Sequence, residues 1–325
     1  MVYLWIGNNM VKKKRNLKNK ILVTGGSGFI GSAIVKYLVK KDYDVTVYDN
    51  NSRGKISRLK EIKKNINFVK GDIRDKKRLI SIKGNFDTVI HLAYVNGTKF
   101  FYSKPFEILD IAVNGLINIL EFSKKKRVKN FYLASSSEVY QNPFKIPTDE
   151  KEMLKIPDIH NPRYSYGGGK IISELYGTYF AKKFFKKFII FRPHNVYGKD
   201  MGNDHVIPEF IKKFKTLKNN KNFKIHGSGN EVRSFIYIED FISGFDKIFR
   251  KGKNLEIYNI GTTEKIKISS LARLMAKNFK KKILLKKIKI FTGSPNIRSP
   301  NILKIKKLGF KQNISLKDGI KKIIK

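Results

Sequence analysis

Residues 24–31 of this chain have the sequence Thr-Gly-Gly-Ser-Gly-Phe-Ile-Gly, and this stretch decides the fold class. It follows a short apolar run, Lys20–Thr24, and leads into Ile30–Lys40, where apolar residues recur at helical spacing. In a strand–turn–helix unit, glycines allow a tight turn, close approach of the backbone to a pyrophosphate, and helix–sheet contact. The sequence therefore predicts a dinucleotide site at the start of the helix, where free N–H groups favour phosphates. The glycines of this pattern are Gly25, Gly26, Gly28 and Gly31.

Asp49 follows the next strand-like run, Asp44–Tyr48, and comes 18 residues after Gly31. A carboxylate at this position accepts hydrogen bonds from the adenosine ribose and repels a 2′-phosphate. The sequence therefore favours NAD over NADP as the cofactor. Arg53 lies close enough in sequence to weigh against that preference, because a guanidinium would suit a 2′-phosphate.

Strand and helix patterns alternate along the chain as far as Pro193. The apolar runs predict strands at 20–24, 44–48, 66–70, 87–92, 131–134 and 188–192, and helices at 30–40, 108–122 and 170–187. This alternation indicates a parallel sheet with helices on both faces. We expect an α/β protein, and the family resemblance given below implies a Rossmann-like doubly wound parallel sheet with a smaller C-terminal substrate-binding α/β domain. Beyond Pro193 the pattern is less regular, with helical spacing at 269–279 and 314–324.

The same patterns divide the chain into three parts. Residues 1–19 form a basic N-terminal extension that we expect to be disordered, and Met10 is an alternative start. Residues 20–195 are expected to form the NAD-binding domain. The family resemblance given below implies that residues 196–325 are mainly the substrate-binding domain, with segments near 235–260 returning to the first domain.

The chain is strongly basic, with a formal charge of +43 over 325 residues. The charge comes from 57 Lys against 12 Arg, in a chain also rich in Ile, Asn and Phe, which indicates A/T-rich codons rather than selection for nucleic acid. Nucleic-acid surfaces depend more on Arg. We therefore expect no nucleic-acid partner, although residues 265–325 hold 19 Lys and Arg against one acidic residue, a charge that catalysis does not explain.

Composition also excludes several kinds of site. The chain has no Cys, which removes disulfides, thiolate zinc sites and Cys nucleophiles. No run approaches the ~18 consecutive apolar residues of a membrane span, and the N-terminal order of apolar and basic residues is wrong for a signal peptide. No His, Asp and Glu cluster has metal-ligand spacing, so we expect no metal. A soluble, cytoplasmic protein without a membrane partner is the expectation.

Tyr166 and Lys170 are four residues apart, one helical turn on one face. A tyrosine with a pKa of ~10 acts as a base at neutral pH only if its phenolate is stabilised. A nearby ammonium supplies that stabilisation, together with a positive nicotinamide. Tyr164 is a competing tyrosine, but Tyr166 alone has the lysine four residues later.

With these motifs in place, residues 20–325 resemble an extended short-chain dehydrogenase/reductase of the NAD-dependent nucleotide-sugar epimerase/dehydratase family. Two positions depart from the family pattern. Tyr94 stands where a small residue is common after His-x-Ala, and Asn301 stands where Asp is frequent. The motifs that carry the resemblance lie at 24–31, 49, 71–75, 91–93, 135–140, 166–170, 191–198 and 233–237.

The resemblance implies roles for individual residues. Tyr166 would take the proton of a sugar hydroxyl, Lys170 would hold the nicotinamide ribose, and Ser136 would bond the reacting hydroxyl. Catalytic roles are implied for Tyr166, Lys170, Ser136 and Glu138. Cofactor contacts are implied for Gly25, Gly28, Phe29, Ile30, Gly31, Asp49, Asn50, Asp72, Ile73, Leu92, Ala93 and Lys170. Substrate contacts are implied for Ser136, Asn195, Arg233 and Arg298, the two arginines clamping a diphosphate.

The resemblance leaves the reaction open. In this family NAD⁺ takes a hydride from a sugar carbon, and the fate of the keto-sugar decides the product. Dehydratases carry Asp-Glu before Val-Tyr, whereas this chain has Ser137-Glu138, so a general acid is missing. We favour a C4 epimerase of a UDP-sugar. A UDP-glucuronate-type decarboxylase, which also has Ser-Glu here, and a 4,6-dehydratase remain alternatives.

A non-catalytic nucleotide- or RNA-binding member of the superfamily is a further alternative, which the presence of both Tyr166 and Lys170 disfavours. The resemblance also implies a homodimer formed through helices 108–122 and 170–187, a nucleotide-sugar substrate, and a place in surface polysaccharide assembly. The sugar and the base of the nucleotide are left open.

Overall fold

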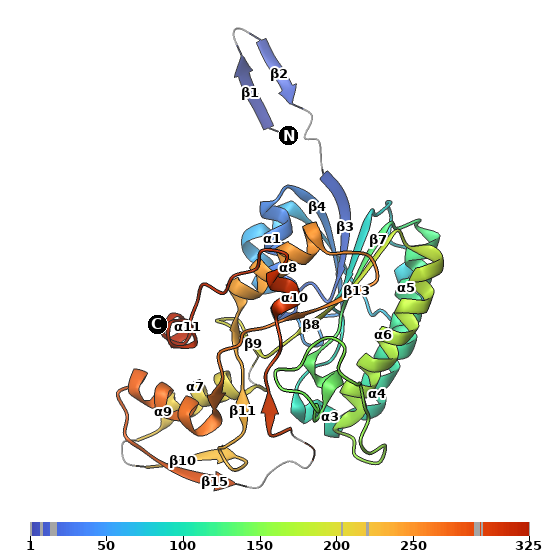
Figure 1. Ribbon diagram of the computed structural model, residues 1–325. Coiled ribbons are helices and arrows are strands. Elements are labelled where there is room, and N and C mark those ends of the chain that lie inside the picture. The colour runs from blue at the N-terminus through green and yellow to red at the C-terminus, as the bar shows by residue number, and fades with distance from the viewer. Residues whose placement is uncertain are drawn as a thin grey trace.

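The centre of the protein is a seven-stranded parallel sheet, seen in a computed structural model (Figure 1). The structure describes residues 2–6, 9–13, 18–202, 204–218, 221–288, 293 and 295–324. Ile21, Leu22 and Val23 are fully buried, as expected where helices cover both faces of a parallel strand. In spatial order the strands are β13 (Glu256–Ile260), β8 (Lys187–Pro193), β7 (Asn130–Ala134), β6 (Thr88–His91), β3 (Lys18–Thr24), β4 (Tyr43–Asp49) and β5 (Ile66–Lys70).

One face of the sheet is covered by helices from both halves of the chain. Phe241, Phe245 and Ile248, spaced at four and three residues, bury one stripe of α8 against the strands and α1. The sequence patterns predicted α1 but not α8, which lies within the stretch 235–260. The elements of this face are α1 (Phe29–Lys40), the 3₁₀ segment η1 (Ile56–Asn65), α8 (Ile238–Lys251) and α10 (Leu303–Lys306).

The opposite face carries the helices on the right of Figure 1. The helix expected at 108–122 begins at Pro105 and continues to Lys125, with one π-helical turn inside it. The helix expected at 170–187 begins at Tyr164 and ends at Phe184. The elements are α2 (Lys76–Ile80), α3 (Thr98–Ser103), α4 (Pro105–Asp110), the π turn η2 (Ile111–Gly115), α5 (Leu116–Lys125) and α6 (Tyr164–Phe184).

The remaining elements surround a separate apolar cluster at the lower left of Figure 1. Its strands pair as β9 (Val196–Tyr197) with β12 (Ile236–Tyr237), β10 (Lys221–His226) with β15 (Ile283–Ile288), and β11 (Val232–Arg233) between β14 (Ile266–Lys267) and β16 (Ile297–Arg298). Its helices are α7 (Val206–Thr216), α9 (Ile268–Asn278) and α11 (Leu316–Ile324). In the central sheet, a 3₁₀ turn, η3 (Ser137–Tyr140), follows β7.

Two short strands lie within residues 1–19, which the sequence predicted to be a basic extension. Strand β1 (Val2–Ile6) pairs antiparallel with β2 (Asn9–Lys13), and β3 begins at Lys18. For residues 1, 7–8 and 14–17 the prediction lies outside the described residues. Throughout the described ranges, no helix has the length and apolar character to cross a membrane.

The order of the strands in the sheet indicates where a ligand would bind. The chain runs outward from β3 through β4 to β5, then returns to the other side of β3 with β6. In open parallel sheets, ligands bind beyond the carboxyl ends of the strands, at the point where the order reverses. That point lies between β3 and β6, directly after the glycine turn.

Candidate active site

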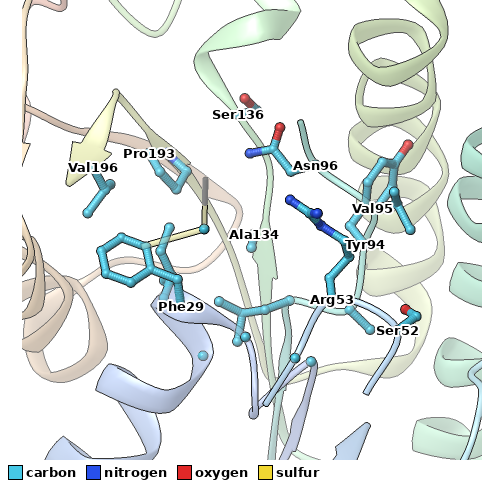
Figure 2. Close-up of a pocket in the computed structure, with 18 of the residues that line it drawn as sticks. Phe29, Ser52, Arg53, Tyr94, Val95, Asn96, Ala134, Ser136, Pro193 and Val196 are labelled. Atoms are coloured by element: carbon cyan, nitrogen blue, oxygen red, sulfur yellow. The ribbon is translucent and has the colours of Figure 1, made fainter. Parts of the chain in front are cut away.

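A cleft of about 770 Å³ opens at this switch point. Figure 2 shows it lined from both halves of the chain, with Phe29, Pro193 and Val196 on one side and Arg53 and Tyr94 on the other. Every site residue predicted from the sequence lines this cleft except Arg233. The structure therefore brings together residues from 25 to 298 in one space.

The glycine turn forms a cradle that only glycine fits. Gly25 has φ +73°, and a Cβ on it would lie 2.6 Å from the nitrogen of Ala93. A Cβ on Gly31 would lie 2.1 Å from the carbonyl oxygen of Gly25, where helix α1 begins. This close backbone packing at a helix N-terminus fits the pyrophosphate of a dinucleotide.

The Asp49 carboxylate organises the same turn from the end of β4. It accepts hydrogen bonds from the N–H of Ser27 at 2.9 Å and of Asn51 at 2.8 Å. Arg53, the nearby cation, is paired with Asp204 at 2.7 Å, and its guanidinium lies 4.4 Å from the ring centroid of Phe100. Because Asp204 pairs with Arg53, that guanidinium is not free for a 2′-phosphate, and the carboxylate of Asp49 lines the cleft as the preference for NAD expects.

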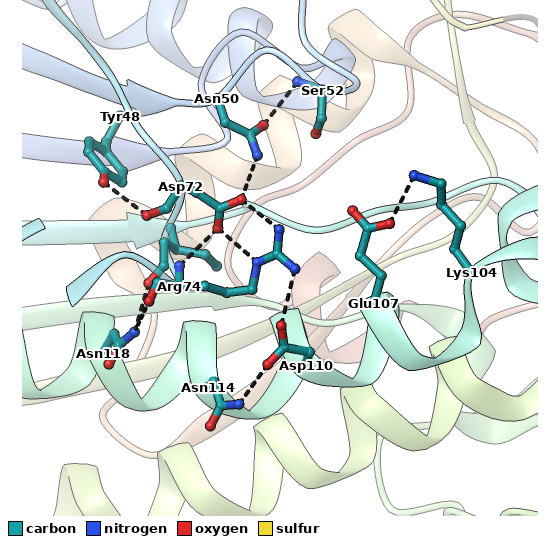
Figure 3. A network of polar contacts seen from close by, with 11 residues as sticks. Tyr48, Asn50, Ser52, Asp72, Arg74, Lys104, Glu107, Asp110, Asn114 and Asn118 are labelled. Carbon is teal, nitrogen blue, oxygen red and sulfur yellow. Dashed lines mark hydrogen bonds and ion pairs between the residues drawn. The ribbon is translucent and has the colours of Figure 1, made fainter. Parts of the chain in front are cut away.

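A polar network holds the loop after β5 at the other end of the cofactor half (Figure 3). Arg74 donates to both carboxylate oxygens of Asp72, at 3.0 and 2.8 Å, and to Asp110 of α4 at 3.1 Å. Asn50 donates to Asp72 at 2.9 Å. These hydrogen bonds lower the pKa of Asp72, against burial, which raises it. A Cβ on Gly115 would lie 2.5 Å from Ile73, so the π turn packs directly on this loop.

Tyr166 and Lys170 lie on α6 beneath the loop that follows β7. Tyr166 shares a hydrogen bond with the hydroxyl of Ser136, and the ring of Phe101 stacks on it at 4.8 Å. The Lys170 ammonium donates to the carbonyl of Ala134 at 2.7 Å. The predicted triad is therefore assembled, with Ser136 against the phenol and Lys170 against the strand end.

Burial sets the protonation of this pair. Burial raises the pKa of Tyr166 above its usual range, although the hydrogen bond from Ser136 opposes the change. Burial lowers the pKa of Lys170 to about 7, against the charge of Glu174. In this state the phenol of Tyr166 holds its proton at neutral pH, and a cation bound nearby would be needed to lower its pKa.

Glu138 and Arg298 form an ion pair that the sequence did not predict. The Arg298 guanidinium donates to both carboxylate oxygens of Glu138, at 2.8 and 2.9 Å, and Arg163 lies 3.8 Å away. Burial alone would raise the pKa of Glu138, but the two arginines lower it to about 2. Glu138 is thus ionised at all physiological pH values.

The remaining substrate residues lie where the two halves meet. Asn195 lines the cleft at φ +40° and donates to the carbonyl of Ser234 at 3.1 Å. Arg233 is the register partner of Arg298 in the β11–β16 pair and donates to the carbonyl of Val232 at 2.9 Å. Arg233 does not line the cleft, so the structure does not place the predicted pair of clamping arginines together in it.

Sequence reasoning missed several residues of the site. Arg163 directly precedes α6, and no sequence motif marks it. Arg58 donates to the carbonyl of Asp200 and follows the strand that ends at Asp49, and no sequence motif marks it either. Tyr94 was noted as unusual but given no role. Within the described ranges, no group of three His, Asp or Glu side chains could hold a metal ion.

Comparisons with known proteins agree with this geometry. Residues 21–261 match the model of the NAD dependent epimerase/dehydratase family. A dTDP-D-glucose 4,6-dehydratase of Dictyostelium discoideum is 34% identical over 78% of this chain, which spans 61% of that protein. A UDP-N-acetyl-alpha-D-glucosaminuronate decarboxylase of Bacillus cytotoxicus is 30% identical over 95% of this chain and 97% of its own length.

Solved structures show the same fold. The UDP-glucose 4-epimerase of Thermotoga maritima, crystallised with UDP-glucose, is 28% identical, with a TM-score of 0.84 over 94% of this chain and 97% of that one. These three relatives carry three different reactions, so they give the class of enzyme and not the reaction. The predicted family, fold class and NAD dependence are confirmed. This chain belongs to the NAD-dependent epimerase/dehydratase family, whose relatives here are epimerases, dehydratases and decarboxylases of nucleotide sugars.

Proposed function

We propose that this protein is a nucleotide-sugar 4-epimerase, acting on a UDP-sugar, with Tyr166 as the base. One observation carries the choice among the family's reactions: the carboxylate of Glu138 is held ionised by Arg298 and Arg163. The site therefore offers the hydroxyls of Tyr166 and Ser136 for proton transfer, and its nearest carboxyl has no proton to give.

Dehydration requires more proton-transfer groups than these two hydroxyls. Elimination of water needs an acid to protonate the leaving hydroxyl and a base to remove a proton from the neighbouring carbon. Ser137 stands where dehydratases of this family carry the acidic residue, and an alcohol is a far weaker acid than a carboxyl. With a pKa of about 2, Glu138 cannot replace it as the acid.

Epimerisation needs only what the cleft provides. When bound, NAD would supply a hydride acceptor and a positively charged ring. The Tyr166 oxygen takes the proton of the sugar hydroxyl and later returns it, and Ser136 bonds the same hydroxyl. Lys170 lines the cleft and donates to the carbonyl of Ala134; with NAD and sugar bound, its ammonium would hold ribose oxygens and would favour the phenolate of Tyr166.

A product analysis tests this proposal. The purified protein is incubated with UDP-, dTDP-, GDP- and CDP-sugars, and products are examined by mass spectrometry and NMR. We expect a product of unchanged mass with inverted C4 from a UDP-sugar. Loss of water from the substrate would refute the argument from Glu138.

Decarboxylation of a UDP-hexuronate is the second candidate. Three guanidinium groups, Arg163, Arg233 and Arg298, act on the single carboxylate of Glu138 and leave an excess of positive charge. That excess suits a substrate with a carboxylate beside its diphosphate. The Bacillus cytotoxicus relative is such a decarboxylase by name. A product lighter by one CO₂ would favour this candidate over the epimerase.

We also propose a homodimer in the cytoplasm. The outer face of α6 exposes Leu175 at 60% and Tyr179 at 62%, and neighbouring α4 exposes Phe106 at 81%. Apolar side chains gathered on one face favour a protein partner, and a second copy presents the same face. Light scattering should give the mass of a dimer for the native chain, and Leu175→Lys with Tyr179→Lys should give a monomer.

A further inference from the structure

Tyr94 occupies the wall of the cleft next to the catalytic pair, where the family pattern has a small residue. It follows β6, and Figure 2 shows its ring among the lining residues, with its hydroxyl directed toward α6. The hydroxyl is buried and has no hydrogen-bond partner among the described residues. A buried hydroxyl without a partner costs free energy, so the ring must be retained there for another reason.

The space for this ring is created on α6 by a glycine. A Cβ on Gly169 would lie 2.2 Å from the hydroxyl oxygen of Tyr94 and 2.8 Å from the Cβ of Ala112 on the π turn. Gly169 directly precedes Lys170. Helix α6 therefore has no side chain at the position where Tyr94 contacts it. Since that position directly precedes Lys170, Tyr94 packs against the part of the helix that carries the lysine.

Tyr94 touches both members of the catalytic pair. The Lys170 nitrogen lies 3.9 Å from the centroid of the Tyr94 ring, over its face. The edge-to-face contact of Tyr94 with Tyr166 has a centroid distance of 5.1 Å. A ring face carries negative charge density and attracts an ammonium, most strongly where water is excluded. Lys170 is only 3% exposed.

The other groups around Lys170 do not neutralise it. On α6, Glu174 is engaged by Arg192 at 2.8 and 2.5 Å. On β6, the buried ring of His91 bonds the hydroxyl of Thr24 at 2.7 Å, and burial together with the Lys170 charge lowers its pKa to about 3. On β7, only the neutral carbonyl of Ala134 accepts from the ammonium. Tyr166, on the same helix face, is a neutral phenol in this state.

We propose that Tyr94 is a positioning residue whose ring face holds Lys170 as an ammonium and keeps it beside Tyr166. The inference rests on the role proposed above for Lys170. The aromatic ring adds to the charge of Glu174, which is shared with Arg192, in favouring the ammonium of Lys170. It thereby preserves the charge that must lower the pKa of the Tyr166 phenol.

The test compares two rings of nearly the same shape at position 94. Tyr94→Phe keeps the π face, and incorporation of pentafluorophenylalanine at the same position reverses its charge distribution with little change in size, so folding is preserved. The readout is the pKa of Lys170 itself, measured without sugar from the pH dependence of its acylation rate by peptide mass spectrometry. A cation–π contact in a buried site predicts that fluorination lowers this pKa by about one unit.

Phe101→Leu is the matched control, because Phe101 stacks on Tyr166 but its ring makes no contact with the Lys170 ammonium in the described structure. We expect Tyr94→Phe and Phe101→Leu to leave the Lys170 pKa where it is in the native chain. An equal Lys170 pKa in the Phe and pentafluoro-Phe proteins would overturn the proposal. So would an equal fall in Phe101→Leu, which would indicate packing and not the ring charge.

The pH profile of turnover gives a second readout. If fluorination lowers the pKa of Lys170, kcat should stay high over a narrower pH range in the pentafluorophenylalanine protein. Tyr94→Phe should keep the native pH profile of kcat. If no sugar is turned over by any variant, the proposed function fails, yet the acylation experiment still decides the role of Tyr94. The two failures are therefore distinguishable.

Discussion

Replacing Glu138 by Gln tests the observation on which the proposed reaction depends. The native carboxylate is bound by two hydrogen bonds from Arg298, and its pKa falls from 4.5 to about 2. At about 1.4 kcal/mol per unit of pKa, ionised Glu138 stabilises the folded chain by roughly 3 kcal/mol at neutral pH. Loss of one partner of a buried pair costs about 3–5 kcal/mol, so the two magnitudes agree.

The direction of the pKa change of Glu138 determines how the stability of the folded chain depends on pH. Because the folded pKa is depressed, the stabilisation is present above pH 4.5 and is lost as the pH falls toward 2. Urea unfolding of the native chain and Glu138→Gln should therefore differ by roughly 3 kcal/mol at pH 7. The difference should shrink by about 1.4 kcal/mol per pH unit below 4.5.

Glu61→Gln is the control for this experiment. Glu61 lies on the surface with its side chain 70% exposed, 3.7 Å from Lys36, and an exposed pair contributes about 0–1 kcal/mol. It should show little difference from the native chain at any pH. A Glu138→Gln difference that does not change between pH 7 and pH 3 would refute the ionised state of Glu138.

Three further predictions follow from the site. Tyr94→Phe removes a buried hydroxyl without a partner, so its Tm should equal or exceed that of the native chain by calorimetry. Asp49→Asn weakens an acceptor that holds the Ser27 and Asn51 N–H groups, and titration calorimetry should show NAD affinity lower by about tenfold. Ser137→Asp alone should not create a dehydratase, because the pKa of about 2 makes ion-paired Glu138 too weak a base to remove a carbon-bound proton, and appearance of a 4-keto-6-deoxy sugar by mass spectrometry would contradict this.

The cofactor half of the site could be predicted from the sequence because its signals are local. The glycine turn at 24–31, Asp49 at the end of the next strand, and Tyr166 with Lys170 each depend on spacing within one strand–turn–helix unit or one helical turn. Gly25, Gly28 and Gly31 of the turn, Asp49, Tyr166 and Lys170 line the cleft. The helix carrying Tyr166 was predicted to begin too late, because its three glycines disfavour a helix; Gly167 packs against Gln141, Gly168 against Ile156 and Gly169 against Tyr94.

The substrate half was less predictable because its contacts join distant parts of the chain. Glu138 and Arg298 are 160 residues apart, and no local pattern relates them. The resemblance assigned Arg298 to a diphosphate, whereas in this structure it binds Glu138. Arg233 does not line the cleft, and its strand β11 pairs with β16, a pairing of two-residue strands that sequence patterns do not reveal.

The most direct test of the central claim is the fate of a UDP-sugar in the presence of the native protein and of Tyr166→Phe. NMR of the product should show inversion at C4 with unchanged mass for the native protein, and no turnover for Tyr166→Phe, while both proteins bind NAD equally. A product that has lost water or CO₂, or undiminished turnover by Tyr166→Phe, would contradict the account.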